Sequence, residues 1–172
     1  IANKAYSKDM SFPASSKDFK TITFKQYRVH DFAWFADKRF NVLRGEVLVP
    51  SLGRKVNSWA FFTNNEPELW SKSIEYINDA TAFYSLMNGD YPYNHVTAVD
   101  GTISAGGGME YPNITIIGES HSEFTLETTI MHEVGHNWFY GIIASNEREH
   151  PWMDEGMNSY YDRRYNLQQY KS

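Results

Sequence analysis

The sequence predicts an α+β fold in a single domain. Segments rich in β-branched and aromatic residues dominate the first third of the chain, and two long segments with helical periodicity fill the last third. Strands first and helices last favour α+β over a regular alternation of strands and helices. A length of 172 residues is that of one domain and is enough to bury a core without disulfides.

The composition excludes several classes of protein. Apolar residues make up 41% of the chain and charged residues 22%, which is ordinary for a soluble protein and excludes the disordered and membrane-spanning classes. The net charge is −5 and no run of Lys or Arg is interleaved with aromatic residues, so we expect no nucleic-acid partner. The chain has no cysteine, which excludes disulfides, thiol nucleophiles and thiolate metal sites.

The start of the chain carries no readable targeting signal. It opens Ile-Ala-Asn-Lys, without an initiator Met or a signal-peptide pattern, as expected of an excised or mature segment. No apolar run approaches the length needed to span a membrane. A cytoplasmic and an extracytoplasmic location therefore both stay open.

The first predicted elements are strands that follow a polar arm or loop. Residues 1–18 are rich in Ser and Lys and form this arm. Strands are predicted over Thr21–Val29, Phe40–Val49 and Val56–Thr63, because each is rich in β-branched and aromatic residues. We expect these strands to belong to a mixed sheet.

A helix and two short strands occupy the middle of the chain. Asn65-Glu66-Pro67 is a typical helix start, and Asn88-Gly89 is a typical end. Short apolar strands are predicted at His95–Val99 and Ile114–Ile117, and the glycines Gly106–Gly108 break the chain between them.

Two helices complete the prediction. The first runs from Phe124 to about Ile143, and the second runs from Pro151 to about Tyr170. Residues 132–136, His-Glu-Val-Gly-His, lie on the first of these helices. Residues four apart on a helix share one face, about 5–6 Å apart at Cβ, so His132 and His136 can bind one cation. Glu133 is then near enough to take a proton from a water on that cation.

A second feature makes the metal prediction more specific. Glu155 follows His136 after 18 intervening residues, early in the second helix. Two imidazoles and a carboxylate from a second helix leave one position of a tetrahedral zinc site open for water. The alternative is a surface His pair and a solvated carboxylate, and it would require both features to arise by chance.

Asp162 lies seven residues beyond Glu155, two turns along the same helix face. It could accept the second ring N–H of a ligand histidine and so fix the tautomer. An exposed helix charge is an equally good interpretation of this residue, and the sequence leaves both open.

These motifs resemble those of the gluzincin zinc aminopeptidases, the membrane alanyl aminopeptidase family with a thermolysin-like catalytic domain. The resemblance rests on the His pair with Glu133, on the 18-residue gap, and on Glu155-Gly156. Gly107-Gly108-Met109-Glu110, 21 residues before His132, is similar to the exopeptidase motif of the family. The resemblance extends over roughly residues 30–165.

The resemblance implies a fold, a metal and a substrate. The fold is a thermolysin-like zincin half-domain, in which a mixed sheet is followed by two zinc-binding helices, and the metal is one Zn²⁺. His132, His136 and Glu155 would bind the zinc, and Glu133 would be the general base. Gly107, Gly108, Met109 and Glu110 would bind a peptide with a free N-terminus. Glu110 would pair with the terminal ammonium, which internal peptide segments lack.

Two departures from the family pattern stand out. Tyr111 occupies the position at which the family has Asn, in the segment that binds the amine. The family also donates a hydrogen bond to the tetrahedral intermediate from a Tyr several tens of residues after the glutamate ligand, whereas this chain stops 17 residues after Glu155. We therefore expect residues 19–172 to be the N-terminal, zinc-binding portion of a catalytic domain. Its C-terminal helical portion would belong to the remainder of a parent chain.

The predicted activity is zinc-dependent hydrolysis of N-terminal residues from peptides. Two alternatives stay open at the level of sequence. One is a zinc endopeptidase of similar fold, and the other is a non-catalytic fragment that binds zinc or a partner. A need for a free substrate amine would separate an aminopeptidase from an endopeptidase, because Glu110 would require that amine.

Overall fold

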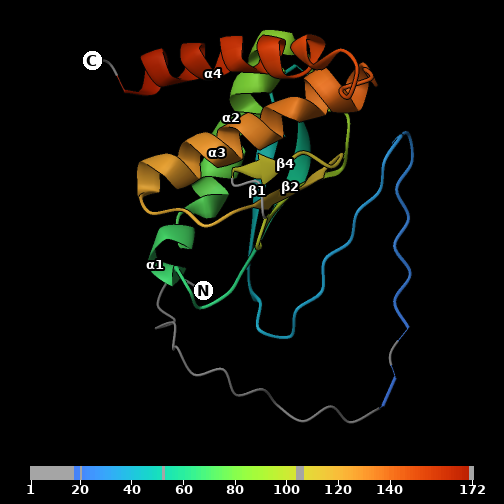
Figure 1. Cartoon of the computed structure of the whole chain (residues 1–172), viewed down its shortest axis with the longest axis vertical. Helices are drawn as coiled ribbons and strands as arrows, with labels where there is room; N and C mark the ends of the chain where they lie inside the picture. The colour runs from blue at the N-terminus through green and yellow to red at the C-terminus, as the bar shows by residue number, and fades with distance from the viewer. Residues whose placement is uncertain (1–17, 20, 52, 104–106, 171–172) are drawn as a thin grey trace.

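The computed structural model describes residues 18–19, 21–51, 53–103 and 107–170, so most of the predicted arm at residues 1–18 lies outside the described residues. Within them the fold is α+β, with a five-stranded mixed sheet and helices packed against it (Figure 1). No helix in the described part is both long and apolar enough to cross a membrane.

The sheet has the order β1-β2-β3-β5-β4. Strands β1 (Asn41–Val49) and β2 (Arg54–Phe62) are antiparallel, with Asn41 opposite Phe62. The strands predicted at these two segments are β3 (His95–Asp100) and β5 (Ile114–Ile117), and both continue the sheet in parallel. β4 (Gly108–Met109) adds an antiparallel edge where only a glycine break was expected.

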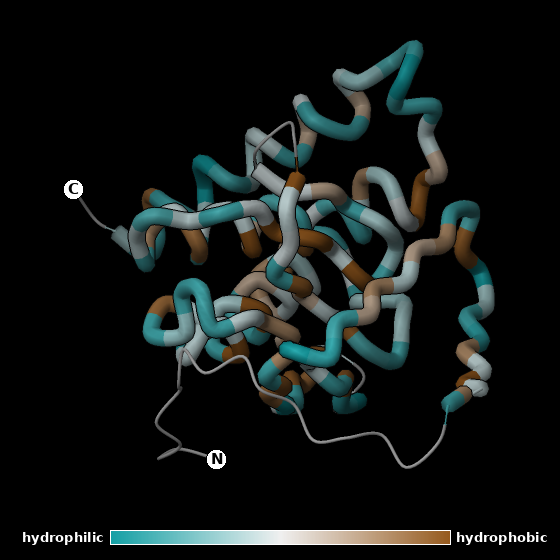
Figure 2. The backbone as a smooth tube through the Cα atoms, turned by 60° about the horizontal axis from the view of Figure 1, so that its bottom comes forward, coloured by the Kyte–Doolittle hydropathy of each residue, from teal (hydrophilic) through white to brown (hydrophobic). Residues whose placement is uncertain are grey.

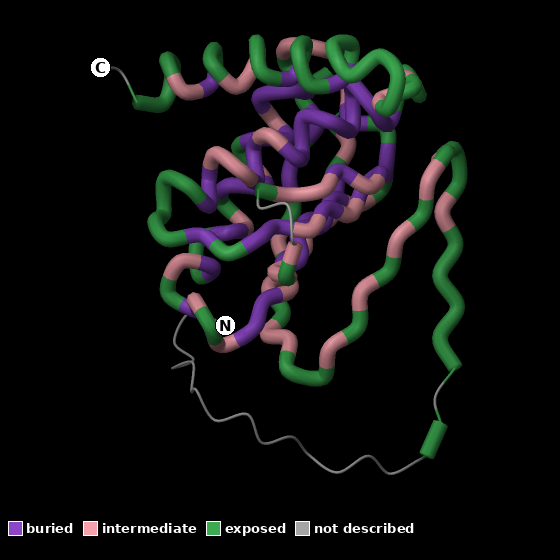
Figure 3. Tube along the Cα trace, viewed as in Figure 1, coloured by how far each residue is buried: buried purple, intermediate pink, exposed green. Residues whose placement is uncertain are grey.

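One face of the sheet is covered by helices. Alternate residues of β2 are buried, among them Val56, Ala60 and Phe62. Helix α2 (Ser73–Asn88) packs against β1 so closely that a Cβ on Gly45 would lie 2.4 Å from Ile74 Cγ2. Figure 3 shows the buried residues concentrated between the sheet and the helices, whereas the outermost helix, α4 (Glu155–Gln169), is mostly exposed.

The helix predicted to start at Pro67 is divided in two. A single helical turn, α1 (Pro67–Trp70), is followed by α2 after a break at Ser71–Lys72. The long helix predicted to end at Ile143 is α-helical only as α3 (Glu123–His136) and continues as a π-helical segment, Asn137–Ile142. Such π-helical turns are rare and often lie at functional sites.

The strand predicted at Thr21–Val29 is wrong. Residues 21–26 have no regular secondary structure, and Phe24 and Tyr27 are 72% and 77% exposed. Figure 1 shows this segment, in blue, as an extended loop outside the sheet, and Val29 near its end packs against the core. Figure 2 shows the hydropathy along the backbone of the chain. β-rich composition suits a pleated, half-buried surface, but a strand also needs a neighbour for its backbone hydrogen bonds. No strand of the described residues pairs with this segment.

Aromatic residues fill much of the core. The largest fully buried side chains include Trp70, Tyr84, Tyr91 and Phe62. Tyr84 stacks on Trp138 with ring centroids 5.3 Å apart, which ties α2 to the segment that follows α3. This packing holds the C-terminal end of α3, where both histidines of the motif lie, in a fixed position relative to the sheet.

Candidate metal centre

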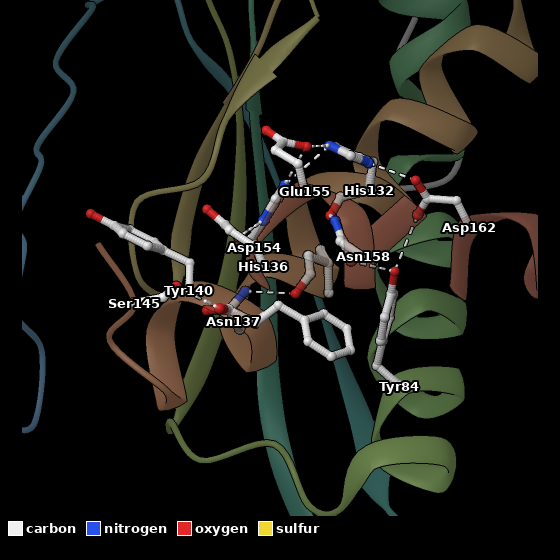
Figure 4. A network of polar contacts seen from close by, with 12 residues as sticks. Tyr84, His132, His136, Asn137, Tyr140, Ser145, Asp154, Glu155, Asn158 and Asp162 are labelled. Carbon is white, nitrogen blue, oxygen red and sulfur yellow. Dashed lines mark hydrogen bonds and ion pairs between the residues drawn. The ribbon is translucent and has the colours of Figure 1, made fainter. Parts of the chain in front are cut away.

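Helix α3 brings the two motif histidines to one point. The helix starts at Ser122, whose side chain accepts a hydrogen bond from the Thr125 backbone N–H at 3.1 Å, a common helix cap. Near the other end, the Nε2 atoms of His132 and His136 lie 3.0 Å apart (Figure 4). The rings are nearly perpendicular, with an interplanar angle of 84°.

Glu155 completes a triangle of donor atoms. It is the first residue of α4, directly after the 3-10 turn Pro151–Met153. Glu155 Oε2 lies 3.3 Å from His132 Nε2 and 3.7 Å from His136 Nε2. Bonds of about 2.0–2.1 Å to a tetrahedral zinc ion imply donor separations of about 3.3 Å. The three separations between donor atoms range from 3.0 to 3.7 Å, around that value. Two nitrogens and one carboxylate oxygen therefore fit a zinc ion in chemical type and in spacing.

Each histidine also contacts a carboxylate through its second ring nitrogen. His132 Nδ1 lies 2.6 Å from Asp162 Oδ2. His136 Nδ1 is hydrogen-bonded to Asp154 Oδ1, and both of these side chains are almost fully buried. A carboxylate in this position fixes the tautomer so that Nε2 carries a free lone pair. Asp154 was missed in the sequence, where the only signal is that it directly precedes Glu155.

The charge of Asp162 also affects the protonation of His132. Burial alone would lower the pKa of His132, but the hydrogen bond and charge of Asp162, with smaller effects of Glu133 and Glu155, raise this pKa to about 9. Without a metal, both nitrogens of the His132 ring are therefore protonated at neutral pH. A cation that binds Nε2 must displace the proton on that nitrogen.

A buried polar network holds the two helices together. Asn158 of α4 donates a hydrogen bond to the His132 carbonyl at 2.7 Å and accepts one from the Tyr84 hydroxyl at 2.7 Å. The same hydroxyl lies 3.2 Å from Asp162 Oδ1. Gly135 allows this approach, since a Cβ there would lie 2.1 Å from Asn158 Oδ1 and 2.3 Å from the Tyr84 ring. Neither Tyr84 nor Asn158 carries a signal in the sequence that links it to the motif.

Glu133 lies beside the donor triangle, in contact with β4. Its side chain is buried, and its Oε2 has no hydrogen-bond partner. Burial raises the pKa of Glu133 to about 7, although His136 and His132 act in the opposite direction. A Cβ on Gly108 would lie within 2.4–2.5 Å of the Glu133 carboxylate and Cγ. Gly108 therefore makes room for Glu133, a reason for the glycine that the sequence did not suggest.

A cleft of about 430 Å³ opens next to these residues. Its walls are formed by β4, α3 and α4, and include Gly107, Gly108, His132, Glu133, Glu155 and Asp162. Gly107 has φ +69°, which favours glycine. Met109 pairs with Ile116 across the two short strands, so its backbone lies at the edge of the sheet.

Glu110 is buried behind this cleft and is not among the residues that line it. Donor atoms of Glu110, His136 and Asp154 all lie within 4.8 Å of one another. Burial, together with a hydrogen bond to Glu147 and the charges of Glu147 and Asp154, raises the pKa of Glu110 to about 8. The predicted amine-binding carboxylate is therefore close to the histidines but in an acidic, enclosed position.

Solved structures to which this chain is similar in fold include zinc metallopeptidases. The chain is similar to an M1 zinc metallopeptidase from Deinococcus radiodurans, with a TM-score of 0.58 and 14% identity over 77% of this chain and 30% of that one. A variant of a two-domain M1 zinc metallopeptidase bound to L-tryptophan gives a TM-score of 0.60 at 14% identity, over 77% and 29%. Legionella pneumophila aminopeptidase A in complex with aspartic acid gives 0.50 at 12% identity, over 59% and 13%.

Sequence similarity to curated proteins covers a shorter stretch. Leucine aminopeptidase 2-1 of Meyerozyma guilliermondii is 37% identical over 60 residues, which is 34% of this chain and 10% of that protein. Leucine aminopeptidase 2 of Candida albicans is 33% identical over 60 residues, with the same coverage. No family model matches the chain. The chain has the fold of the M1 zinc metallopeptidases, and the resemblance to the gluzincin zinc aminopeptidases that its motifs indicate is confirmed.

Proposed function

We propose that this chain carries the zinc site of a metallo-aminopeptidase that removes N-terminal residues from peptides. The observation that supports the zinc site is the triangle of His132 Nε2, His136 Nε2 and Glu155 Oε2, with edges of 3.0, 3.3 and 3.7 Å. The carboxylates on both Nδ1 atoms support it further, since this arrangement is typical of histidines that bind metals.

Glu133 is the proposed general base. When bound, zinc would polarise the scissile carbonyl and make water a stronger acid. Glu133 lines the cleft, and its Oε2 has no hydrogen-bond partner, so it is free to accept a proton. It would take the proton of the attacking water and later pass it to the leaving amine.

The proposed substrate is a peptide with a free N-terminus. Gly107 and Gly108 line the cleft at the β4 edge, where a peptide could lie alongside as a further strand. Glu110 would accept hydrogen bonds from the terminal ammonium. Two of the similar structures are described as bound to L-tryptophan and to aspartic acid, and both ligands have a free α-amine.

Residues 19–172 are the proposed N-terminal, zinc-binding portion of a thermolysin-like catalytic domain. The chain spans about 10% of the curated relatives and about 30% of the first similar structures. This coverage supports the proposal that the remainder of a parent chain contributes the C-terminal helical portion.

The experiment that tests the zinc site measures zinc stoichiometry in three forms of the chain. We expect one zinc in the parent chain, one zinc in Glu133→Gln, and none in His132→Ala. Loss of zinc from Glu133→Gln, or retention in His132→Ala, would contradict the assigned roles.

A second measurement separates an aminopeptidase from an endopeptidase. In the complete enzyme, we expect amino-acid amides to be cleaved and the matching N-acetylated compounds to be left intact. Glu133→Gln should abolish cleavage, because the amide cannot accept the proton of the attacking water. Equal rates on free and blocked substrates would favour the endopeptidase.

A further inference from the structure

Helix α4 is attached to the rest of the molecule at two buried points. Of its fifteen residues, all of them described, only Asn158 and Tyr165 are buried. Asn158 lies at the level of the donor triangle, where it contacts the His132 carbonyl and the Tyr84 hydroxyl. Tyr165 follows two turns later, about 10 Å along the helix axis at about 1.5 Å per residue. The angle of α4 against α3 therefore depends on both points.

The second point is held by a buried carboxylate that the proposed reaction does not use. Glu127 of α3 is 7% exposed, and each of its two oxygens accepts a hydrogen bond from a tyrosine at the C-terminal end of α4. The Tyr165 hydroxyl donates to Oε1 at 2.8 Å, and the Tyr170 hydroxyl donates to Oε2. The Tyr165 ring also packs edge-on against Phe83 of α2, with ring centroids 5.4 Å apart. The far end of α4 is thus fixed to two helices.

Both tyrosines keep the protons that they donate. Burial, followed by the hydrogen bond and the charge of Glu127, raises the pKa of Tyr165 and of Tyr170 above the usual value for Tyr. A buried carboxylate that lost these donors would be left without partners, which is costly. The contact between Glu127 and the two hydroxyls therefore keeps α4 against α3.

We propose that Glu127 is a positioning residue for the metal centre, which sets the angle of α4 against α3 and so keeps Asp162 on His132 Nδ1. This inference rests on the proposed zinc site. Asp162 lies four residues after Asn158 and three before Tyr165, so a shift at either point moves its carboxylate. The contact between Asp162 Oδ2 and His132 Nδ1 is 2.6 Å long, and hydrogen bonds weaken steeply when their geometry is distorted.

The test measures hydrogen exchange of the two histidine ring N–H groups by NMR in the zinc-saturated chain. With zinc on both Nε2 atoms, the Nδ1 proton of His132 faces Asp162, and that of His136 faces Asp154. We expect Glu127→Ala to speed exchange at His132 at least tenfold and to leave exchange at His136 unchanged. The reason is that Asp154 precedes α4 and lies outside the span between its two buried residues.

Zinc affinity gives a second readout. In a chelator-competition titration we expect Glu127→Ala to bind zinc about tenfold more weakly than the parent, since loss of an outer carboxylate typically costs about 10–100-fold. Glu127→Gln keeps one oxygen that can accept a hydrogen bond from a tyrosine. Its zinc affinity should therefore lie between those of the parent and of Glu127→Ala.

Val56→Ala is the matched control for a loss of stability alone. Val56 is fully buried in β2, so its truncation destabilises the core from the sheet, and any effect on exchange should be the same at both histidines. The inference is overturned if Glu127→Ala also changes both exchange rates by the same factor, if it changes neither, or if its zinc affinity equals that of the parent. If the parent takes up no zinc, the proposed function fails instead, and exchange in the metal-free chain still tests the role of Glu127.

A second variant keeps the inference testable if Glu127→Ala does not fold. Tyr165→Phe removes one hydroxyl and leaves the ring packed on Phe83. We expect the same selective change at His132, smaller than in Glu127→Ala because the hydrogen bond from Tyr170 remains. Unchanged exchange at His132 in this variant would overturn the inference.

Discussion

The two histidines of the donor triangle lie in different environments. The His136 side chain is 1% exposed and its carboxylate partner Asp154 is also 1% exposed, whereas the His132 side chain is 26% exposed at the edge of the cleft. His136 is thus part of the core, and the pair that it forms with Asp154 contributes to the packing of α3 against α4. His132 faces solvent, where ligands and protons exchange. Helix α3 therefore supplies the same triangle with one buried histidine, His136, and one partly exposed histidine, His132.

The largest expected effect is on stability, and it tests the difference in burial between the two histidines. His136→Ala leaves the buried carboxylate of Asp154 without a partner, and removing one member of a buried pair costs about 3–5 kcal/mol. His132→Ala removes a partly exposed ring and should cost clearly less. We expect urea unfolding of the metal-free chain to show this order. Equal losses in the two variants would mean that the difference in burial has no energetic consequence.

A smaller effect is expected from the carboxylate on the exposed side. Asp162→Asn removes the charge that orients His132, and outer carboxylates of this kind typically contribute about 10–100-fold to metal affinity. We expect a loss of that size in a chelator-competition titration at pH 9, with stability nearly unchanged. Affinity equal to that of the parent at this pH would exclude a role for Asp162 in metal binding.

The smallest effect is a change in pH dependence. The metal-free pKa of His132 is about 9, so below that pH zinc must displace a proton. The apparent zinc affinity of the parent should therefore rise with pH, by about tenfold per unit at most for this one proton, and level off above pH 9. In Asp162→Asn the pKa falls toward its ordinary value of about 6.5, so the rise should end near neutral pH. Parallel curves for the two proteins would contradict this account.

Sequence and structure agree best where one local pattern determines the result. The spacing of His132 and His136 follows from helix geometry alone, and the strands at residues 41–49 and 114–117 follow from their β-branched residues. The strand expected at residues 21–29 failed because strand formation depends on a neighbour that composition cannot specify. The edge strand Gly108–Met109 was missed for the converse reason, since its partner β5 makes it a strand.

In the candidate site, too, contacts between residues distant in sequence could not be predicted. The residues of the donor triangle could be predicted from spacing. For Asp162, the sequence left open whether it contacts a ligand histidine or is an exposed charge. Asp154, Asn158 and Tyr84 could not be predicted, because their contacts depend on how α2, α3 and α4 pack. No spacing along the chain relates Tyr84 to a residue 74 positions away, although the two side chains are hydrogen-bonded.

The close contact of helices at Gly135 affects the geometry of the donor triangle. At Gly135, helices α2, α3 and α4 approach so closely that a single methyl group would not fit. The lack of a side chain at Gly135 therefore allows the short distance between these helices. The position of the His132 ring relative to Glu155 is therefore coupled to residues that touch no donor atom. A larger or smaller side chain at Tyr84, which lies between these helices, would alter the gap into which the proposed zinc would fit. The proposed metal site would therefore respond to a substitution at a residue that contacts none of its donor atoms.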